Sequence, residues 1–84
     1  MRVAPRITAV TPGDRPLTLL VRWSQGGESL IDISGLIKAF RAYAPLRDDP
    51  ALFAKVEVGE LGSDVIWSDE IDIAADSLWR LTQG

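Results

Sequence analysis

A pair of glycines between two alternating segments constrains this chain more than any other feature. Along residues 17–23 every second side chain is apolar, namely Leu17, Leu19, Val21 and Trp23. This alternation is typical of a strand with one buried face. Gly26 and Gly27 then supply the positive φ angles that a tight hairpin needs. Residues 28–33 alternate again, so the sequence predicts a β-hairpin over residues 17–33.

Turn and cap residues delimit the other predicted elements. We expect further strands over about residues 5–10, 55–58 and 64–67, and a brief extended stretch at 71–73. We expect helices over about residues 35–43, 50–54 and 75–82. Ser34 is the predicted N-cap of the first helix, and Pro45 is expected to end it near residue 44. Asp49 and Pro50 suit the cap and first position of the second helix.

Apolar spacing within the predicted helices indicates which side chains they bury. In the first helix these are Leu36, Ile37, Phe40 and Tyr43, and in the last helix Leu78 and Leu81, with Trp79 partly covered. Hairpins followed by helices favour an α+β fold. We therefore expect one domain over residues 1–84, with a small, mostly antiparallel sheet and two or three short helices packed on one face.

Missing residue types exclude several kinds of chemistry. The chain has no histidine and no cysteine, which excludes an imidazole general base, a thiol nucleophile and the common zinc sites within one chain. No phosphate-binding glycine motif is present either. We expect no enzyme activity, no cofactor and no metal. No apolar run is long enough for a signal sequence or a membrane span, so a cytoplasmic location is the expectation.

Carboxylates are the remaining reactive groups, and they gather near the end of the chain as Asp69, Glu70, Asp72 and Asp76. Oxygen ligands suit calcium, and two acids across a cleft suit glycoside hydrolysis. The spacing does not follow the EF-hand pattern, and a chain of this size leaves little room for a cleft. We interpret these acids as solvated residues, with Asp72 and Asp76 favourable near a helix N-terminus.

Charge is divided unevenly along the chain. Residues 1–47 carry seven bases and three acids, whereas residues 48–84 carry two bases and nine acids. The two halves could attract each other, or one of them could meet a partner. Arg2, Arg6, Arg15 and Arg22 beside the first strands suit nucleic acid, although the acidic pI of 4.7 argues against it. The candidate partner surface comprises Arg6, Arg15, Arg22, Asp69, Glu70, Asp72 and Trp79.

The three tryptophans have two possible roles. Trp23 shares its face with apolar residues, and Trp67 lies on a strand with Ile66, so both are expected in the core. Trp79 either closes the core or remains partly exposed as an anchor for a partner, since tryptophan is enriched at binding hot spots.

Six short segments occur together in a known order. They are Arg6-Ile7-Thr8-Ala9-Val10, Ile31-Asp32-Ile33, Pro45-Leu46-Arg47-Asp48, Leu52-Phe53-Ala54-Lys55-Val56, Val65-Ile66-Trp67 and Asp76-Ser77-Leu78-Trp79. Together they resemble the small bacterial domains of domain-of-unknown-function family 2442. The resemblance implies a compact α+β domain without known catalytic residues. Some relatives precede a helix-turn-helix domain, and others lie beside a second small protein, as in toxin–antitoxin pairs.

The chain departs from the resembled pattern in three places. It ends at Gly84, so no helix-turn-helix is expected to follow. Trp79 stands where tyrosine is common, and Ser68-Asp69-Glu70 replaces a proline and glycine turn. We expect a non-catalytic protein-binding module, such as the partner or antitoxin-like member of a two-protein system, that binds a small protein or a second copy of itself. The alternative is a nucleic-acid-associated regulator that acts as a dimer or in a complex.

Overall fold

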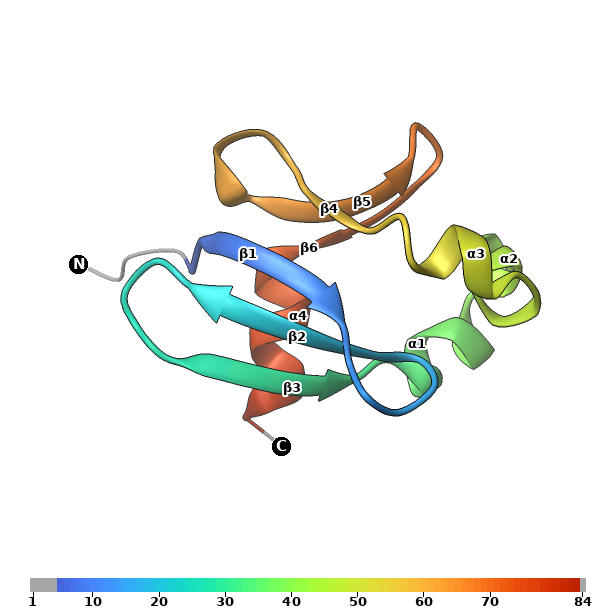
Figure 1. The fold of residues 1–84 in the computed structure, drawn as a ribbon, viewed down its shortest axis with the longest axis horizontal. Coiled ribbons are helices and arrows are strands. Elements are labelled where there is room, and N and C mark those ends of the chain that lie inside the picture. Colours follow the sequence, from blue (N-terminus) through green and yellow to red (C-terminus); the bar gives the residue numbers. More distant parts are fainter. Residues whose placement is uncertain (1–4, 84) are drawn as a thin grey trace.

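The computed structural model describes residues 5–83, which form two three-stranded antiparallel sheets and several short helices (Figure 1). Sheet A consists of β1 (Ile7–Pro12), β2 (Thr18–Trp23) and β3 (Glu28–Asp32), in that order. Sheet B consists of β4 (Glu57–Val58), β5 (Asp64–Ser68) and β6 (Ile71–Ala74). The predicted α+β class is confirmed, although the single sheet expected from the sequence is divided into two.

The predicted hairpin is present as β2 and β3. Leu19 pairs with Ile31, and the backbone N–H of Trp23 donates to the carbonyl of Gly27 at 3.1 Å. Gly26 and Gly27 have φ angles of +108° and +86°, as a tight turn requires. The strand begins at Thr18 rather than at residue 17, because Leu17 has a left-handed φ of +59°.

The second hairpin belongs to sheet B. β4 pairs with β5 through the 3₁₀ turn η2 (Glu60–Gly62), and the extended stretch expected at 71–73 is the full strand β6. β6 runs directly into α4 (Ala75–Thr82), whose bounds match the prediction. The two sheets adjoin at β1, where the Nη1 group of Arg6 donates to the carbonyl of Leu61 at 3.4 Å.

The helical segment that connects β3 to β4 in the chain differs most from the sequence prediction. The helix expected over residues 35–43 is divided into α1 (Ser34–Ala39) and the 3₁₀ turn η1 (Arg41–Tyr43), because Phe40 is extended with φ −124° and ψ 119°. Phe40 consequently points outward and is 54% exposed instead of buried. Pro45 does not end a helix, since it lies in the first turn of α2 (Ala44–Asp48), where its missing N–H costs nothing.

Two carboxylates accept hydrogen bonds from backbone N–H groups at the starts of short helices. Ser34 was predicted to cap α1, but it is the first residue of that helix, and its N–H donates to Asp32 Oδ1 at 2.8 Å. The predicted cap at Asp49 is confirmed, because its Oδ1 accepts from the N–H of Leu52 at 3.2 Å at the start of α3 (Pro50–Phe53). None of the helices within residues 5–83 is long and apolar enough to cross a lipid bilayer.

One hydrophobic core connects both sheets with α4. Leu19 and Val21 from sheet A, Val65 from sheet B and Leu78 from α4 have no exposed surface. Figure 1 shows α4 behind sheet A, with α1, α2 and α3 grouped at one end of the strands. Leu81, which was expected to be buried, is 43% exposed because it lies on the flank of α4 beside β3.

Candidate protein-interaction surface

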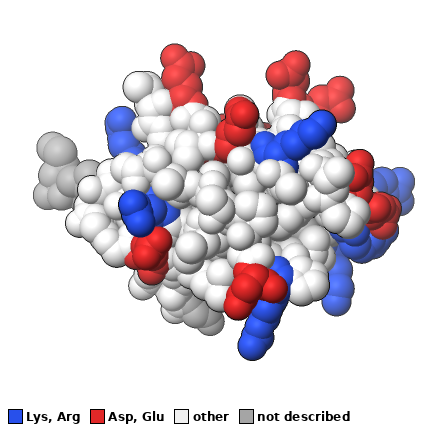
Figure 2. Space-filling view, in the orientation of Figure 1, with Lys and Arg blue, Asp and Glu red and all other residues white. Residues whose placement is uncertain are grey.

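The structure does not gather the arginines of the predicted partner surface. Arg6 precedes β1, Arg15 lies in the turn after it, and Arg22 lies on β2. All three are exposed, and Arg22 forms a 3.6 Å ion pair with Glu28. Arg2 lies outside the described residues. In Figure 2 basic and acidic side chains are interspersed on the visible face, so no continuous basic patch covers it.

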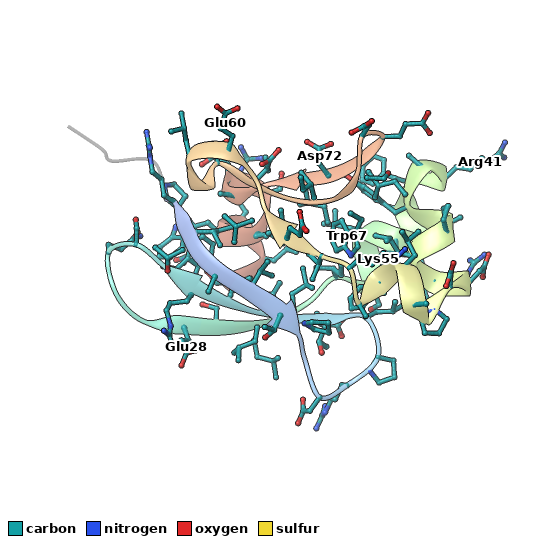
Figure 3. The ribbon with its side chains drawn as sticks, turned by 45° about the horizontal axis from the view of Figure 1, so that its top comes forward. Glu28, Arg41, Lys55, Glu60, Trp67 and Asp72 are labelled. Atoms are coloured by element: carbon teal, nitrogen blue, oxygen red, sulfur yellow. The ribbon has the colours of Figure 1, made fainter. Side chains whose placement is uncertain are left out.

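The predicted acidic residues lie on sheet B. Asp69 and Glu70 form the exposed turn between β5 and β6, and Asp72 is exposed on β6. Figure 3 shows Asp72 on sheet B, far from Glu28 on sheet A. Within residues 5–83, no three acidic side chains are placed so that they could hold one metal ion.

All three tryptophans contact the core. Trp23 and Trp67 are 3% and 7% exposed, and their indole N–H groups donate to Ser29 Oγ at 2.9 Å and to the carbonyl of Phe53 at 3.0 Å. Figure 3 shows Trp67 extending from sheet B toward α3. Trp79 is half-buried and meets Trp23 edge-on, with ring centroids 5.1 Å apart. These contacts favour the core role of Trp79.

The outer edge of β3 is the first feature of a different surface. The bonds Trp23 N–H to Gly27 and Ile33 N–H to Leu17 mark hydrogen-bonded pairs at the two ends of the hairpin. Such pairs alternate along an antiparallel ladder. The backbone groups of Ser29 and Ile31 therefore face β2, whereas those of Glu28, Leu30 and Asp32 face away from it. Among the described strands, β3 pairs with β2 alone.

A hollow of about 420 Å³ follows this edge. It is lined by β3 and by the last turn of α4, through Ser29, Leu30, Ile31, Asp32, Leu81 and Thr82. Leu30 and Leu81 are 54% and 43% exposed, so two large apolar side chains face solvent here. We call the outer edge of β3 together with this hollow the β3–α4 groove.

A second hollow, of about 310 Å³, lies farther along the same flank of α4. Its lining residues are Leu36, Phe40, Ala42, Tyr43, Ile73 and Ser77. Ser77 and Leu81 are four residues apart on α4, so the two hollows share one side of the helix. Phe40 meets Tyr43 edge-on at 6.0 Å, and the Tyr43 hydroxyl donates to the carbonyl of Asp72 at 3.0 Å.

Two exposed carboxylates border the outer face of the β3–α4 groove. Hydrogen bonds from the side chain and backbone of Ser34 hold the pKa of Asp32 below its usual value, so this group is ionised at neutral pH. Glu28 has only the exposed ion pair with Arg22, which contributes at most about 1 kcal/mol. Both acids flank Leu30 on β3 and can therefore meet a partner.

Residues 7–84 match the model of a protein family described as protein of unknown function (DUF2442). The chain belongs to the DUF2442 family. The resemblance seen in the six segments is thereby confirmed. No curated protein sequence matches this chain.

A solved crystal structure is also similar to this DUF2442 domain. It is that of NE0471 from Nitrosomonas europaea ATCC 19718, which is named as a candidate DNA-binding protein. The two share 28% identity with a TM-score of 0.78, over 92% of this chain and 48% of NE0471. The DUF2442 domain thus spans about half the length of NE0471.

The β3–α4 groove was not predicted from the sequence. Leu20 and Leu30 lie at positions that the alternation of the hairpin assigns to the outer face, and the register places them opposite each other. Apolar residues on both strands of an otherwise polar face were a usable signal. The exposure of Leu81 was not readable, because it depends on where α4 crosses β3.

Proposed function

We propose that this DUF2442 domain is a non-catalytic protein-binding module of the bacterial cytoplasm, and the antitoxin-like partner in a two-protein system. The observation that carries the proposal is the β3–α4 groove, where a strand edge that pairs with no other strand of residues 5–83 adjoins exposed Leu30 and Leu81. Edge strands bind partners through backbone hydrogen bonds, and large exposed apolar side chains add buried area.

The lining of the hollows supports a binding role over catalysis. Neither hollow beside α4 is lined by two carboxylates, and the second is mainly apolar. Catalytic sites normally bring titratable groups together in a cleft. The groove instead offers backbone groups and apolar side chains, which suit another polypeptide.

Co-expression with the products of the neighbouring genes tests this proposal. Each mixture would be separated by size-exclusion chromatography with light scattering, at low and at moderate salt. We expect one neighbour to co-elute with the domain at a fixed stoichiometry. If the domain elutes at its own mass in every mixture, or only as a homodimer, the two-protein proposal is wrong.

Nucleic-acid association is the second candidate, and the name of NE0471 is the observation that favours it. The exposed arginines Arg6, Arg15 and Arg22 near sheet A are candidate phosphate contacts. Binding through phosphates weakens steeply with salt. Fluorescence anisotropy with mixed-sequence DNA and RNA at low salt tests this candidate, and a flat titration with both would exclude it.

A further inference from the structure

The β3–α4 groove has the backbone pattern of an unfinished antiparallel sheet. Glu28, Leu30 and Asp32 direct three N–H and three C=O groups away from β2, as the hairpin register requires. An exposed strand edge of this kind is a template for another strand. These backbone groups can therefore form a ladder of hydrogen bonds with an extended segment, but not with a helix.

The last turn of α4 forms one wall of the same groove. An added strand would lie about 4.8 Å from β3, above the hollow that Leu81 and Thr82 line. Every second side chain of that strand would point to α4 and contact exposed Leu81. The alternate side chains would lie on the outer face, beside Leu30. Both faces of the added strand therefore require an apolar residue at the centre.

The acidic side chains of β3 indicate which residues the two ends of an added strand should carry. Glu28 and Asp32 stand on either side of Leu30 and are exposed on the outer face. Arg22 forms an ion pair with Glu28, and Arg15 and Lys38 lie close enough to Asp32 to lower its pKa. These bases reduce the negative potential that the two acids produce farther from the surface. Residues that lie directly opposite each other on neighbouring strands are in contact, so a basic residue opposite each acid remains favourable. Basic residues at the two ends of the added strand meet this requirement.

A second copy of this chain fits the edge poorly. If two β3 strands paired antiparallel about Leu30, Glu28 of each copy would lie opposite Asp32 of the other. Like charges directly opposite destabilise a strand pair, and this arrangement contains two such pairs. The charge pattern therefore favours a different polypeptide.

We propose that the β3–α4 groove binds an extended segment of a partner protein, in which basic residues flank an apolar centre, as an added strand beside β3. This inference rests on the proposed protein-binding function and names its surface and the chemistry of its partner. The added strand pairs with Glu28, Leu30 and Asp32 through backbone bonds and places apolar side chains against Leu81.

The test uses a synthetic peptide that contains Lys-Leu-Val-Leu-Lys, titrated into the full ¹⁵N-labelled chain and followed by NMR and amide hydrogen exchange. We expect the N–H groups of Glu28, Leu30 and Asp32 to exchange at least about tenfold more slowly when peptide is bound. The N–H groups of Ser29 and Ile31 already face β2 and should change little. This alternation is specific to strand addition.

Matched peptides and variants isolate the two interactions. The same peptide with an N-methylated valine, and a peptide with glutamates in place of the lysines, should each bind about tenfold more weakly. Leu30→Pro removes an outward-facing donor and should weaken binding by a similar factor. Glu28→Lys retains the donor and leaves Asp32 as the one acid beside Leu30, so it should largely abolish the preference for the lysine peptide over the glutamate peptide. Leu61→Asn, at a 74% exposed position in η2, is the control that should bind like the wild type.

The possible outcomes distinguish a failure of the strand-addition proposal from a failure of the proposed protein-binding function. Equal binding by the lysine and glutamate peptides, or protection outside residues 28–32, overturns the proposal. A co-eluting natural partner that leaves the amides of Glu28, Leu30 and Asp32 unprotected also overturns it, while the protein-binding function stands. If no protein forms a complex, the function itself is wrong.

Discussion

The folded structure disfavours the ionised form of the Asp64 carboxyl. Asp64 lies on the outer face of sheet B near Asp72, two positions along the neighbouring strand. Burial raises the pKa of Asp64 above its usual 3.8, and the adjacent Asp72 carboxyl raises it further. Between pH 3.8 and this raised pKa, the folded protein therefore binds more protons than the unfolded chain does. Its stability falls as the pH rises from about 3.8 through the raised pKa.

We expect Asp64→Asn to increase the melting temperature at pH 7, because asparagine cannot ionise and can donate a hydrogen bond to Asp72. The increase should shrink as the pH falls toward 3, where Asp64 of the wild type is protonated. Thermal melts followed by circular dichroism over this pH range provide the measurement. Asp69→Asn in the β5–β6 turn removes the same charge as a control. A melting temperature that is lowered at pH 7 would contradict the assignment.

Gly62 is required by its position between the two sheets. Its φ angle is +71°, and a Cβ there would lie 2.5 Å from the backbone oxygen of Ile7 in β1. We expect Gly62→Ala to cost at least about 2 kcal/mol of unfolding free energy, since strain and a backbone clash combine. Urea denaturation provides the measurement.

Gly27→Ala is the matched control for this prediction. Gly27 also has a positive φ of +86°, but no atom lies within 4 Å of the position that its Cβ would take. This variant should show the conformational cost alone, about 1 kcal/mol. Equal losses in the two variants would mean that the approach of Gly62 to β1 is unimportant.

At the scale of elements, the hairpin β2–β3 and the helix α4 could be predicted because local signals agree with the tertiary structure. Alternation and two glycines specify the hairpin, and spacing specifies α4 over residues 75–82. The end of α1 could not be predicted. Phe40 is an ordinary residue that adopts extended geometry, and no glycine or proline near it signals the break.

Packing between elements was also beyond the sequence. The division into two sheets depends on how β1 meets β4 and η2, which no local pattern records. The seven predicted surface residues were chosen for charge and aromatic character, yet they are spread over both sheets and α4. The β3–α4 groove arises instead from a strand edge and a helix end that are distant in sequence.

The contact of Trp79 with Trp23 joins α4 to sheet A, and it makes an element-scale prediction. Trp79→Ala should lower the free energy of unfolding by about 2–4 kcal/mol, because it removes a large half-buried ring and the edge-on contact with Trp23. Trp79→Tyr retains an aromatic ring and should lose less than half as much. Urea denaturation of both variants tests this. Leu81→Ala, on the exposed flank of the same helix, should cost less than about 1 kcal/mol.

At the scale of the molecule, the question is whether two small sheets fold as one unit. Sheet B is small, since β4 has only two residues, and a two-stranded hairpin alone is at best marginally stable. Both sheets contribute to a single core that α4 completes. Sheet A supplies Val21 and sheet B supplies Val65, and neither has exposed surface. The Ser63 carbonyl also accepts from the N–H of Ala75 at 2.8 Å, which fixes the start of α4 to the β4–β5 turn.

We therefore expect one cooperative unfolding transition for both sheets. In a urea titration followed by ¹⁵N NMR, the signals of Val21 and Val65 should disappear with the same midpoint, and with an m-value of about 1 kcal/mol/M, as for other small domains. Gly62→Ala, in the turn between β4 and β5 and against β1, should lower both midpoints together. A lower midpoint for Val65 alone would show that sheet B unfolds separately, and that the core shared through α4 does not couple the two sheets.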